Sequence, residues 1–591
     1  MTGLGKVGGG QRNGASAEGL TSRRTRYANR WQAWRSTRVR PATGFVSQPE
    51  PRTIGSYARG KQLIAGNFLF AGYLIEGPGV KIWDLPMPDP SFEIALHGCT
   101  WLDDLAAVGD GAARSRAQDW VFDWIARYGR GRGPGWTPDL TGRRLIRWIN
   151  HALFLLSGKQ RPEAEAYFRS LAQQTDFLSR RWQAASPGLP RFEALTGLIY
   201  AGLALTGMDR HVSPATAALA RECDTQIGGE GGIPTRNPEE LLEVFTHLTW
   251  AAQALAEAGR VAPAPLRAAI DRIAPTLRAL RHADGGLARF HGGGRGLEGR
   301  LDAALAASGV RVAAPKTLAM GFARLAAGRT TVIVDAAEPP AGPASVNAHA
   351  STLAFEMTSG RRPVIVNCGS GMPFGPEWRR AGRATASHST LAIEGFSSSR
   401  LGPQHGAGSQ LEPLAERAEV IHLRETAGPE GVGLLAGHSG YVATHGLTHM
   451  RALYLSGDGR SLVGEDTLAA LTEAEQARLY TITEGGLPIR LAIRFHLHPD
   501  VDAAIDLGGT AVSLALKSGE IWVFRFEGPA ELELAPSVYL EQRRLKPRGS
   551  QQIVLSASLE GTGSQIRWTL AKAQDTPLAI RDLDPDGGQD D

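Results

Sequence analysis

One histidine, His349, stands in a sequence context where its side chain could do chemistry. Residues 346–371 read VNAHASTLAFEMTSGRRPVIVNCGSG. This pattern predicts two apolar β-segments around a Ser-Gly-Arg-Arg turn, with His349 in the first and Asn367 closing the second. A histidine there can act as a general base, bind a metal ion or be a hydrogen-bonded core residue. The stretch by itself leaves these three roles open.

Two further segments place reactive side chains at a helix start and among glycines. RNPEEL predicts a helix whose N-cap is Asn237, so Arg236 and Asn237 lie where backbone amides favour an anion such as a carboxylate. Glu240 follows in the first turn and could act as a base. His291 in LARFHGGG lies in a segment that we expect to be flexible, to bury little and to face the cleft between two domains. A helix cap without any ligand explains Asn237 equally well.

Three arginines and one polar pair complete the candidates for substrate binding. Arg379, Arg380 and Arg383 in EWRRAGRATASH suit bidentate pairing with a carboxylate or a sulfate, and a solvated loop is the alternative. Asn150 and His151 in WINHALFLL interrupt an apolar helix, where a buried polar pair should be hydrogen-bonded. This pair belongs either to the core or to the inner cleft of a helical domain.

Length and composition indicate what kind of protein carries these residues. With 591 residues, of which 42% are apolar and 21% charged, the chain is long enough for two large domains with separate cores. Its formal charge of +5 reflects residues 1–45, which carry nine Lys and Arg against Glu18, so it does not indicate nucleic-acid binding. The cysteines form no CxxC pair, which argues against a cysteine zinc module and a disulfide framework.

The apolar runs and the N-terminus bear on where the protein acts. No apolar run approaches 18 residues, and the glycine-rich N-terminus lacks the apolar segment of a secretory signal peptide. We therefore expect no transmembrane segment and a cytoplasmic location, with the periplasm or cell envelope as the alternative. Residues 23–40 interleave arginine with Trp31 and Trp34, which suits an acidic polymer or a membrane surface, but a basic tail without a ligand is the simpler interpretation. The oligomeric state is not indicated.

The period of the apolar residues divides the chain into a helical half and a strand half. Between about residues 99 and 283 apolar residues recur at i, i+3, i+4 and i+7, which predicts seven or more helices. After about residue 313 the period becomes 2. We therefore predict an α+β protein with an N-terminal α/α toroid of helical pairs and a C-terminal antiparallel β-sandwich. The expected parts are a basic disordered tail (1–58), an extended or strand collar (59–98), the helical toroid and hinge (99–312), the β-sandwich (313–580) and an acidic tail (581–591).

Several motifs resemble the heparinase II/III family of polysaccharide lyases. In the strand half these are HASTLAFEM, GRRPVIVNCGSG, RRAGRATASHSTLAIEG and HSGYVATHGLTHMRALYLSGDGRSLVGEDTL, within about residues 320–500. In the helical half WTPDLTGRRLIRWINHALFLL, GGIPTRNPEELLEVF and ADGGLARFHGGG are similar to bacterial members. The resemblance implies an acidic, uronic-acid-containing polysaccharide as partner and β-elimination as the reaction. That reaction requires a group that neutralises the uronate, a base for the C5 proton and an acid for the leaving oxygen.

The site residues of the family are only partly present in this chain. The resemblance implies one divalent metal ion, zinc or calcium, held by His349, Asn367 and His388, with Asn367 in the place of an aspartate. Asn347 stands where the family has its first, catalytic histidine, and Glu240 where it has a tyrosine. If the protein cleaves its substrate, we expect catalysis from Asn237, His291, His349 and Arg380. Substrate binding is then expected from Arg236, Glu240, Arg379, Arg383, Asn150, His151 and Asn347.

Two other functions stay open at this point. A protein that kept the cleft but lost the tyrosine would bind a glycan, or take part in assembling an envelope polysaccharide, without cleaving it. A hydrolase would pair Glu240 with a second carboxylate about 5 to 9 Å away. Because an eliminase produces an unsaturated uronate that absorbs ultraviolet light, uronic-acid polysaccharides can separate the first two functions.

Overall fold

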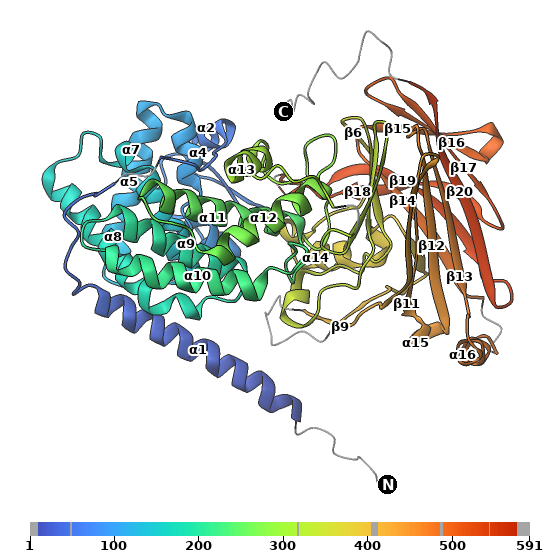
Figure 1. Cartoon of the computed structure of the whole chain (residues 1–591), viewed down its shortest axis with the longest axis horizontal. Helices are drawn as coiled ribbons and strands as arrows, with labels where there is room; N and C mark the ends of the chain where they lie inside the picture. The colour runs from blue at the N-terminus through green and yellow to red at the C-terminus, as the bar shows by residue number, and fades with distance from the viewer. Residues whose placement is uncertain are drawn as a thin grey trace.

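The protein consists of a helical domain and a domain of two large β-sheets, joined end to end (Figure 1). The computed structural model describes residues 10–47, 50–315, 318–402, 412–484, 488–542 and 544–575, with the side chains of the first helix described from residue 23 onward. The acidic tail expected over 581–591 lies outside these ranges. Helices followed by antiparallel sheets confirm the predicted α/α toroid and β-sandwich.

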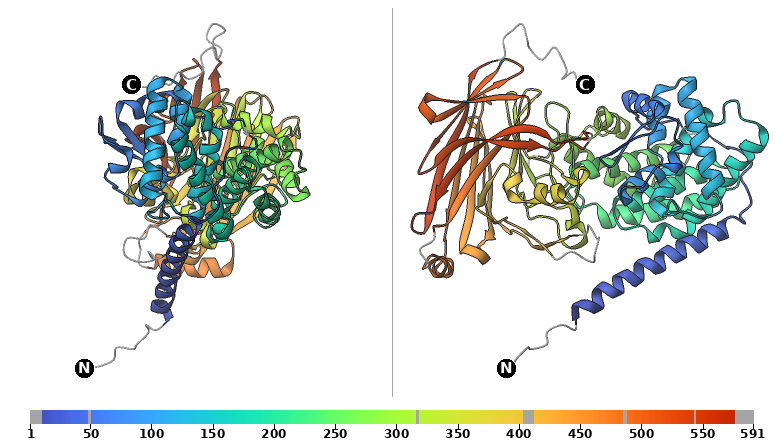
Figure 2. Two further views of the ribbon diagram at one scale, coloured as in Figure 1. Left: turned by 90° about the vertical axis from the view of Figure 1, so that its left-hand side faces the viewer. Right: turned by 180° about the vertical axis from the view of Figure 1, so that it is seen from behind.

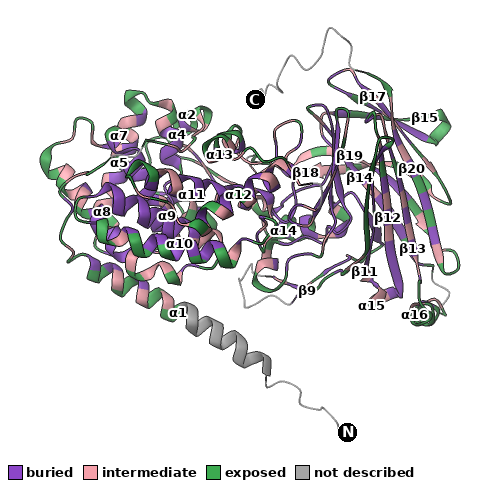
Figure 3. Ribbon diagram, viewed as in Figure 1, coloured by how far each residue is buried: buried purple, intermediate pink, exposed green. Residues whose placement is uncertain are grey.

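The helical domain confirms the 3.6-residue period of its sequence. Its main helices are α4 (Trp101–Val108), α5 (Gly111–Tyr128), α6 (Pro138–Asn150), α7 (Ala152–Leu156), α8 (Arg161–Arg181), α9 (Leu189–Ala204), α10 (Val212–Gln226), α11 (Pro238–Glu257) and α12 (Ala264–Ala279). Helices α6 and α9 approach closely where two glycines meet, because a Cβ on Gly197 would lie 2.5 Å from the Cα of Gly142. Figure 3 shows that α9 and α11 are largely buried, as expected for the inner helices of a toroid.

Two antiparallel sheets form the sandwich. One sheet has the order β10 (Val420–Gly428), β11 (Gly431–Tyr441), β12 (Leu447–Ser456), β13 (Ser461–Ala469), β20 (Gly563–Gln574), β17 (Ile521–Glu527), β16 (Ala511–Leu516), β15 (Val501–Asp506). The other has the order β18 (Glu531–Tyr539), β19 (Arg548–Ser558), β14 (Arg490–Leu497), β6 (Arg362–Val366), β5 (Phe355–Ser359), β4 (Thr330–Asp335), β3 (Phe322–Ala327), and β7 (Leu391–Ile393) also pairs with β14. Their inner faces meet where Phe355 stacks on Trp568, with ring centroids 5.7 Å apart.

Short elements complete the sandwich domain and the link before it. Strands β8 (Arg400–Leu401) and β9 (Leu414–Glu416) pair with each other. The helices are α13 (Arg300–Ser308), which precedes the sheets, and α14 (Pro376–Arg383), α15 (Val442–His445) and α16 (Glu473–Thr483), which lie between strands. None of the described helices combines the length and the hydropathy of a membrane-spanning segment.

The prediction of a disordered tail over 1–58 is wrong for most of the part that the structure describes. Helix α1 (Gly10–Ser36) extends away from the helical domain, and its C-terminal end lies against α8 (Figure 2). Ser36 Oγ donates a hydrogen bond to Asp176 at 2.9 Å, and Gln173 Nε2 donates one to the Ala33 carbonyl at 3.2 Å. The many arginines of this segment suggested a disordered tail. The contacts with α8 are made instead by the small buried residues Ala33 and Ser36, which are not conspicuous in the sequence.

The expected extended collar over 59–98 is correct only for a β-hairpin. Strands β1 (Asn67–Phe70) and β2 (Tyr73–Glu76) form that hairpin, but α2 (Tyr57–Ala65) and α3 (Pro90–His97) flank it. Both helices have a side-chain N-cap: Ser56 accepts from the Arg59 amide, and Asp89 accepts from the Ser91 amide at 2.8 Å. The glycines and prolines of this region suggested an extended chain. In the structure Gly66 ends α2 and Pro90 begins α3.

Candidate functional site

An ion pair between Arg236 and Asp335 joins the helical domain to the sandwich. Arg236 precedes the first turn of α11 and has a φ of 50°, a left-handed conformation that is uncommon outside glycine. Its Nη2 donates to Asp335 Oδ1, at the end of β4, at 2.6 Å. Burial alone would raise the pKa of the Asp335 carboxyl, but Arg236 and His291 outweigh it and hold that pKa below its usual range. The remaining guanidinium donors bind the backbone carbonyls of Met320, Gly321, Ala337 and Glu338.

His291 is a buried member of the same cluster, so the prediction of a flexible, exposed loop is wrong. The side chain is fully enclosed, with Nε2 3.3 Å from Asp335 Oδ2. Nδ1 accepts the backbone amide of His349 at 3.2 Å, so Nε2 carries the proton and donates to Asp335. Burial lowers the pKa of His291 although Asp335 opposes the shift. The glycines around it serve close packing, since a Cβ on Gly293 would lie 2.4 Å from Asn237 Oδ1.

His349 and His388 form a hydrogen-bonded pair next to this cluster. His349 Nδ1 lies 3.0 Å from His388 Nε2. His388 Nδ1 donates a hydrogen bond to the Ala384 carbonyl at 2.8 Å, so His388 Nε2 is the acceptor. His349 Nδ1 is therefore the donor to His388. Both rings are buried, and burial lowers the pKa of His388 to about 4. His349 lies in an irregular segment before β5 rather than in a strand as predicted, because β5 begins only at Phe355.

The predicted metal ligands fit an internal hydrogen-bond network better than a metal centre. The Asn367 side-chain oxygen accepts the Ser389 amide at 2.9 Å, and its amide nitrogen lies 3.5 Å from Glu356 Oε1. His349 and His388 already bind each other. In the part of the chain that the structure describes, no three His, Cys, Asp or Glu residues are grouped to hold a metal ion. Two imidazoles without a third strong donor make a poor zinc site.

Two of the three candidate arginines use their guanidinium groups inside the protein. Arg379 Nη2 donates to the Val346 carbonyl at 2.8 Å and to Asn347 Oδ1 at 3.3 Å. Arg383 Nε donates to the Ala348 carbonyl at 2.7 Å, and burial beside Arg379 lowers its pKa to about 10. These contacts fix the segment that carries His349. The side chain of Arg380 is 58% exposed, so among the three it is the arginine best placed to meet a ligand.

Asn237 caps α11, as the simpler interpretation predicted. Its Oδ1 accepts the amides of Glu239 at 3.0 Å and Glu240 at 3.2 Å. The Glu240 side chain is half-buried near Thr235, and partial burial raises the pKa of its carboxyl. Asn347 is exposed near Gly292, so it lies on the surface above the buried histidines. A role for Asn237, Glu240 or Asn347 in substrate binding stays a prediction.

Asn150 and His151 lie apart from the histidine cluster, in a cleft of about 560 Å³ in the helical domain. His151 Nε2 is 3.0 Å from Asp103 Oδ1 and 3.1 Å from Thr53 Oγ1. Both polar atoms of the Asn150 amide are buried without a hydrogen-bond partner among the described residues. The pair is buried and borders this cleft, so both positions that the sequence allowed, the core and a cleft of the helical domain, stay open, and a role in substrate binding stays a prediction.

Most members of the cluster are candidate residues that the sequence predicted, but Asp335 is not among them. Arg236, His291, His349 and His388 come from four separate segments and form one hydrogen-bonded line across the two domains. Asp335 lies between Arg236 and His291 and contacts both. The sequence did contain a feature that could have identified Asp335, because this residue ends the apolar strand TTVIVD. A carboxylate buried at such a position needs a cation or several hydrogen-bond donors as partners. The line is enclosed and its histidines are neutral, so it is suited to fixing two domains rather than to exchanging protons with a bound substrate.

Comparisons with known proteins agree with this architecture. The family described as heparinase II/III-like, C-terminal, matches residues 311–569. FtsZ-localized protein C of Caulobacter vibrioides (strain NA1000 / CB15N) is 33% identical over 548 residues, which cover 90% of this chain and 91% of that protein.

Solved structures of lyases share the fold. A crystal structure of heparinase III superposes with a TM-score of 0.64 at 14% identity, over 91% of this chain and 88% of that one. A mutant of heparan sulfate lyase HepC from Pedobacter heparinus superposes with a TM-score of 0.58 at 15% identity, over 96% of this chain and 91% of that one. At these identities the likeness is one of fold.

Proposed function

The chain belongs to the heparinase II/III-like family, and from this premise we propose that it binds an acidic, uronic-acid-containing polysaccharide without cleaving it. Family membership supports the binding of a polysaccharide, and the enclosed histidine line is the observation that argues against its cleavage. His291, His349 and His388 are each at most 3% exposed. A general base must come within hydrogen-bond reach of the proton that it removes.

The other groups that cleavage would use also have structural partners. Arg236 binds Asp335 and four carbonyl oxygens, so it has little capacity left to neutralise a uronate. Asn347 stands where a catalytic histidine would be needed, and an amide cannot take up a proton at neutral pH. β-Elimination, the reaction that the resemblance implies, therefore lacks an accessible base at this position.

The experiment tests binding and cleavage on the same samples. Purified protein is incubated with polygalacturonate, alginate, hyaluronan and heparan sulfate while absorbance of unsaturated uronates is followed, and binding is measured by affinity electrophoresis in gels that contain each polymer. We expect retardation by at least one polymer and no rise in absorbance. A rise that His349→Ala abolishes would overturn the proposal in favour of a lyase, and a chain that no polymer retards would overturn polysaccharide binding.

A second candidate function is localisation with FtsZ, favoured by the identity to the Caulobacter protein over nine tenths of the chain. A fluorescent fusion expressed in the native host should then form a band where labelled FtsZ assembles, and the same fusion tests our expectation of a cytoplasmic location. Uniform fluorescence in dividing cells would contradict this candidate. A divalent metal ion at His349 and His388 stays a prediction, which metal analysis of the purified protein decides.

A further inference from the structure

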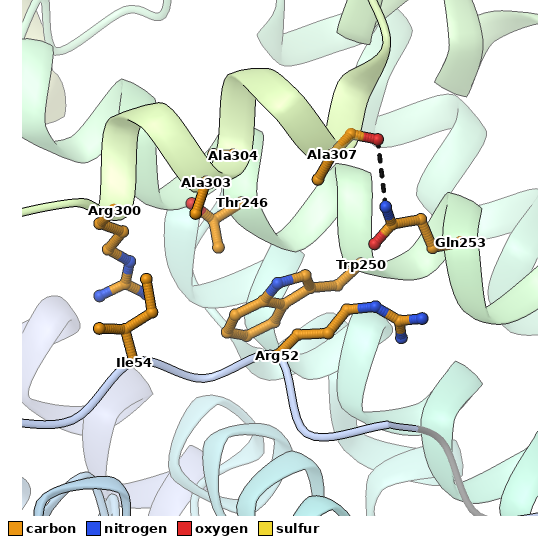
Figure 4. Close-up of a pocket in the computed structure, with 9 residues that line it drawn as sticks. All are labelled: Arg52, Ile54, Thr246, Trp250, Gln253, Arg300, Ala303, Ala304 and Ala307. Atoms are coloured by element: carbon orange, nitrogen blue, oxygen red, sulfur yellow. Dashed lines mark hydrogen bonds between the residues drawn. The ribbon is translucent and has the colours of Figure 1, made fainter. Parts of the chain in front are cut away.

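A pocket of about 240 Å³ in the helical domain combines positive charge with an aromatic wall (Figure 4). It lies between α11, α13 and the extended segment 52–54, and we call it the α13 pocket. Its lining includes Arg52, Trp250, Gln253, Arg300, Ala303 and Ala307. We propose that the α13 pocket binds a single carboxylated sugar ring. This inference rests on the proposed function, the binding of a uronic-acid glycan. It adds that one sugar unit of that glycan is bound in the α13 pocket.

The charge of the lining favours an anion. Arg52 and Arg300 flank Trp250, and the lining contains no Asp or Glu (Figure 4). The carboxylates that pair with these arginines, Glu257 and Glu243, lie outside the lining. A guanidinium carries five N–H donors, and the ion pair of Arg300 with Glu243, at 2.8 Å, engages only part of that set. The two guanidinium groups lie at opposite ends of the pocket, and that of Arg52 also binds Glu257 and Tyr200 (Figure 4). We therefore expect the carboxylate of the sugar at Arg300.

The remaining walls are suited to a sugar ring. Trp250 provides an apolar surface, held in place by His247, whose ring centroid is 5.4 Å away. Gln253 donates from Nε2 to the Ala307 carbonyl at 3.1 Å, while its Oε1 has no partner among the described residues and points toward Trp250 (Figure 4). That oxygen is enclosed, so it is an unsatisfied acceptor beside the pocket. Drug-sized ligands occupy roughly 300–1,000 Å³, so this smaller pocket is suited to one ring.

The alanines of α13 keep the pocket open. Ala303 and Ala307 are exposed and line its mouth one helical turn apart, so a larger side chain at Ala303 would fill the entrance without changing any charge. Ala306 is also exposed on α13 but does not line the pocket. These two positions provide a blocking variant and a matched control.

The test uses the full-length protein and saturation-transfer NMR. The probes are D-galacturonate and D-glucuronate, with D-galactose and D-glucose as neutral counterparts. We expect saturation transfer to at least one uronate and none to its neutral counterpart. Ala303→Phe and Arg300→Gln should each weaken uronate binding about tenfold or more, because one blocks the entrance and the other removes a charge-assisted donor. Ala306→Phe and Arg267→Gln, at an exposed position of α12, should change it less than about twofold.

The possible outcomes separate this inference from the proposed function. Equal transfer to uronates and neutral sugars, or full uronate binding by Ala303→Phe, would overturn the α13 pocket as a uronate site. If the unaltered chain is retarded by a polymer and Ala303→Phe is retarded equally, the polymer binds elsewhere, so the inference fails and the proposed function stands. If no polymer and no uronate binds the unaltered chain, both fail. Circular dichroism and the thermal midpoint confirm that each variant is folded.

Discussion

Replacing Asp335 by asparagine tests whether the Arg236–Asp335 pair holds the two domains together. Asparagine keeps the size of the side chain but removes its charge, which leaves the Arg236 guanidinium enclosed next to a neutral His291. Asp335 is completely buried, and the side chain of Arg236 is 11% exposed. Breaking a buried pair by removing one partner costs about 3–5 kcal/mol. The four carbonyl oxygens that Arg236 keeps place the expected loss at the lower end, about 3 kcal/mol.

The loss of unfolding free energy is measured by urea denaturation, followed by tryptophan fluorescence. We expect a lower urea concentration at the midpoint and an unchanged dependence of the unfolding free energy on urea. The matched control is Asp302→Asn, which removes the partner of Arg281 at the surface, where Asp302 is 62% exposed. An exposed pair contributes about 0–1 kcal/mol, so the control should barely move the midpoint. A double variant Arg236→Met/Asp335→Asn should lose less than the sum of its single changes, because the uncompensated cation is then absent. The reasoning would be refuted if Asp335→Asn cost no more than Asp302→Asn.

Two further predictions concern pH and the packing of the inner helices. The pKa of His388 is about 4 in the folded protein against an ordinary value of 6.5, so between these pH values the unfolded chain binds more protons at this residue. Stability should therefore fall with decreasing pH over that range, by up to about 1.4 kcal/mol per pH unit from this residue. Urea midpoints at pH 7 and pH 5 should differ less in His388→Gln than in the unaltered chain, and an equal difference would contradict the assignment. Gly142→Ala should destabilise the helical domain, because its Cβ would lie 2.3 Å from the Glu193 carbonyl oxygen, whereas Gly229→Ala, with no atom within 4 Å of its Cβ, should leave the thermal midpoint nearly unchanged. Equal midpoints for the two glycine variants would show that α6 and α9 can move apart at low cost.

The elements of this fold were largely predictable because their signals are local. The apolar period of 3.6 before residue 283 and of 2 after residue 313 identified a helical domain and a sandwich, and Asn237 was correctly assigned as a helix cap. The errors at α1, α2 and α3 arose where short-range composition competed with long-range packing. Helix α1 is anchored by Ser36 on Asp176, 140 residues along the chain, and no local pattern contains that contact.

The sequence shows which positions carry imidazole, guanidinium and carboxylate groups, and its motifs resemble those of one family. The partners of those groups became known only from the folded structure. His291 looked mobile among glycines, yet the glycines allow close packing that encloses it against Asp335. Arg379 and Arg383 looked free for a ligand, yet they bind the carbonyls of the segment around His349. Whether a polar group meets substrate or another part of the chain depends on contacts between segments that are distant in the sequence. Some of these contacts lie within the sandwich, and others, such as Arg236–Asp335, join the two domains.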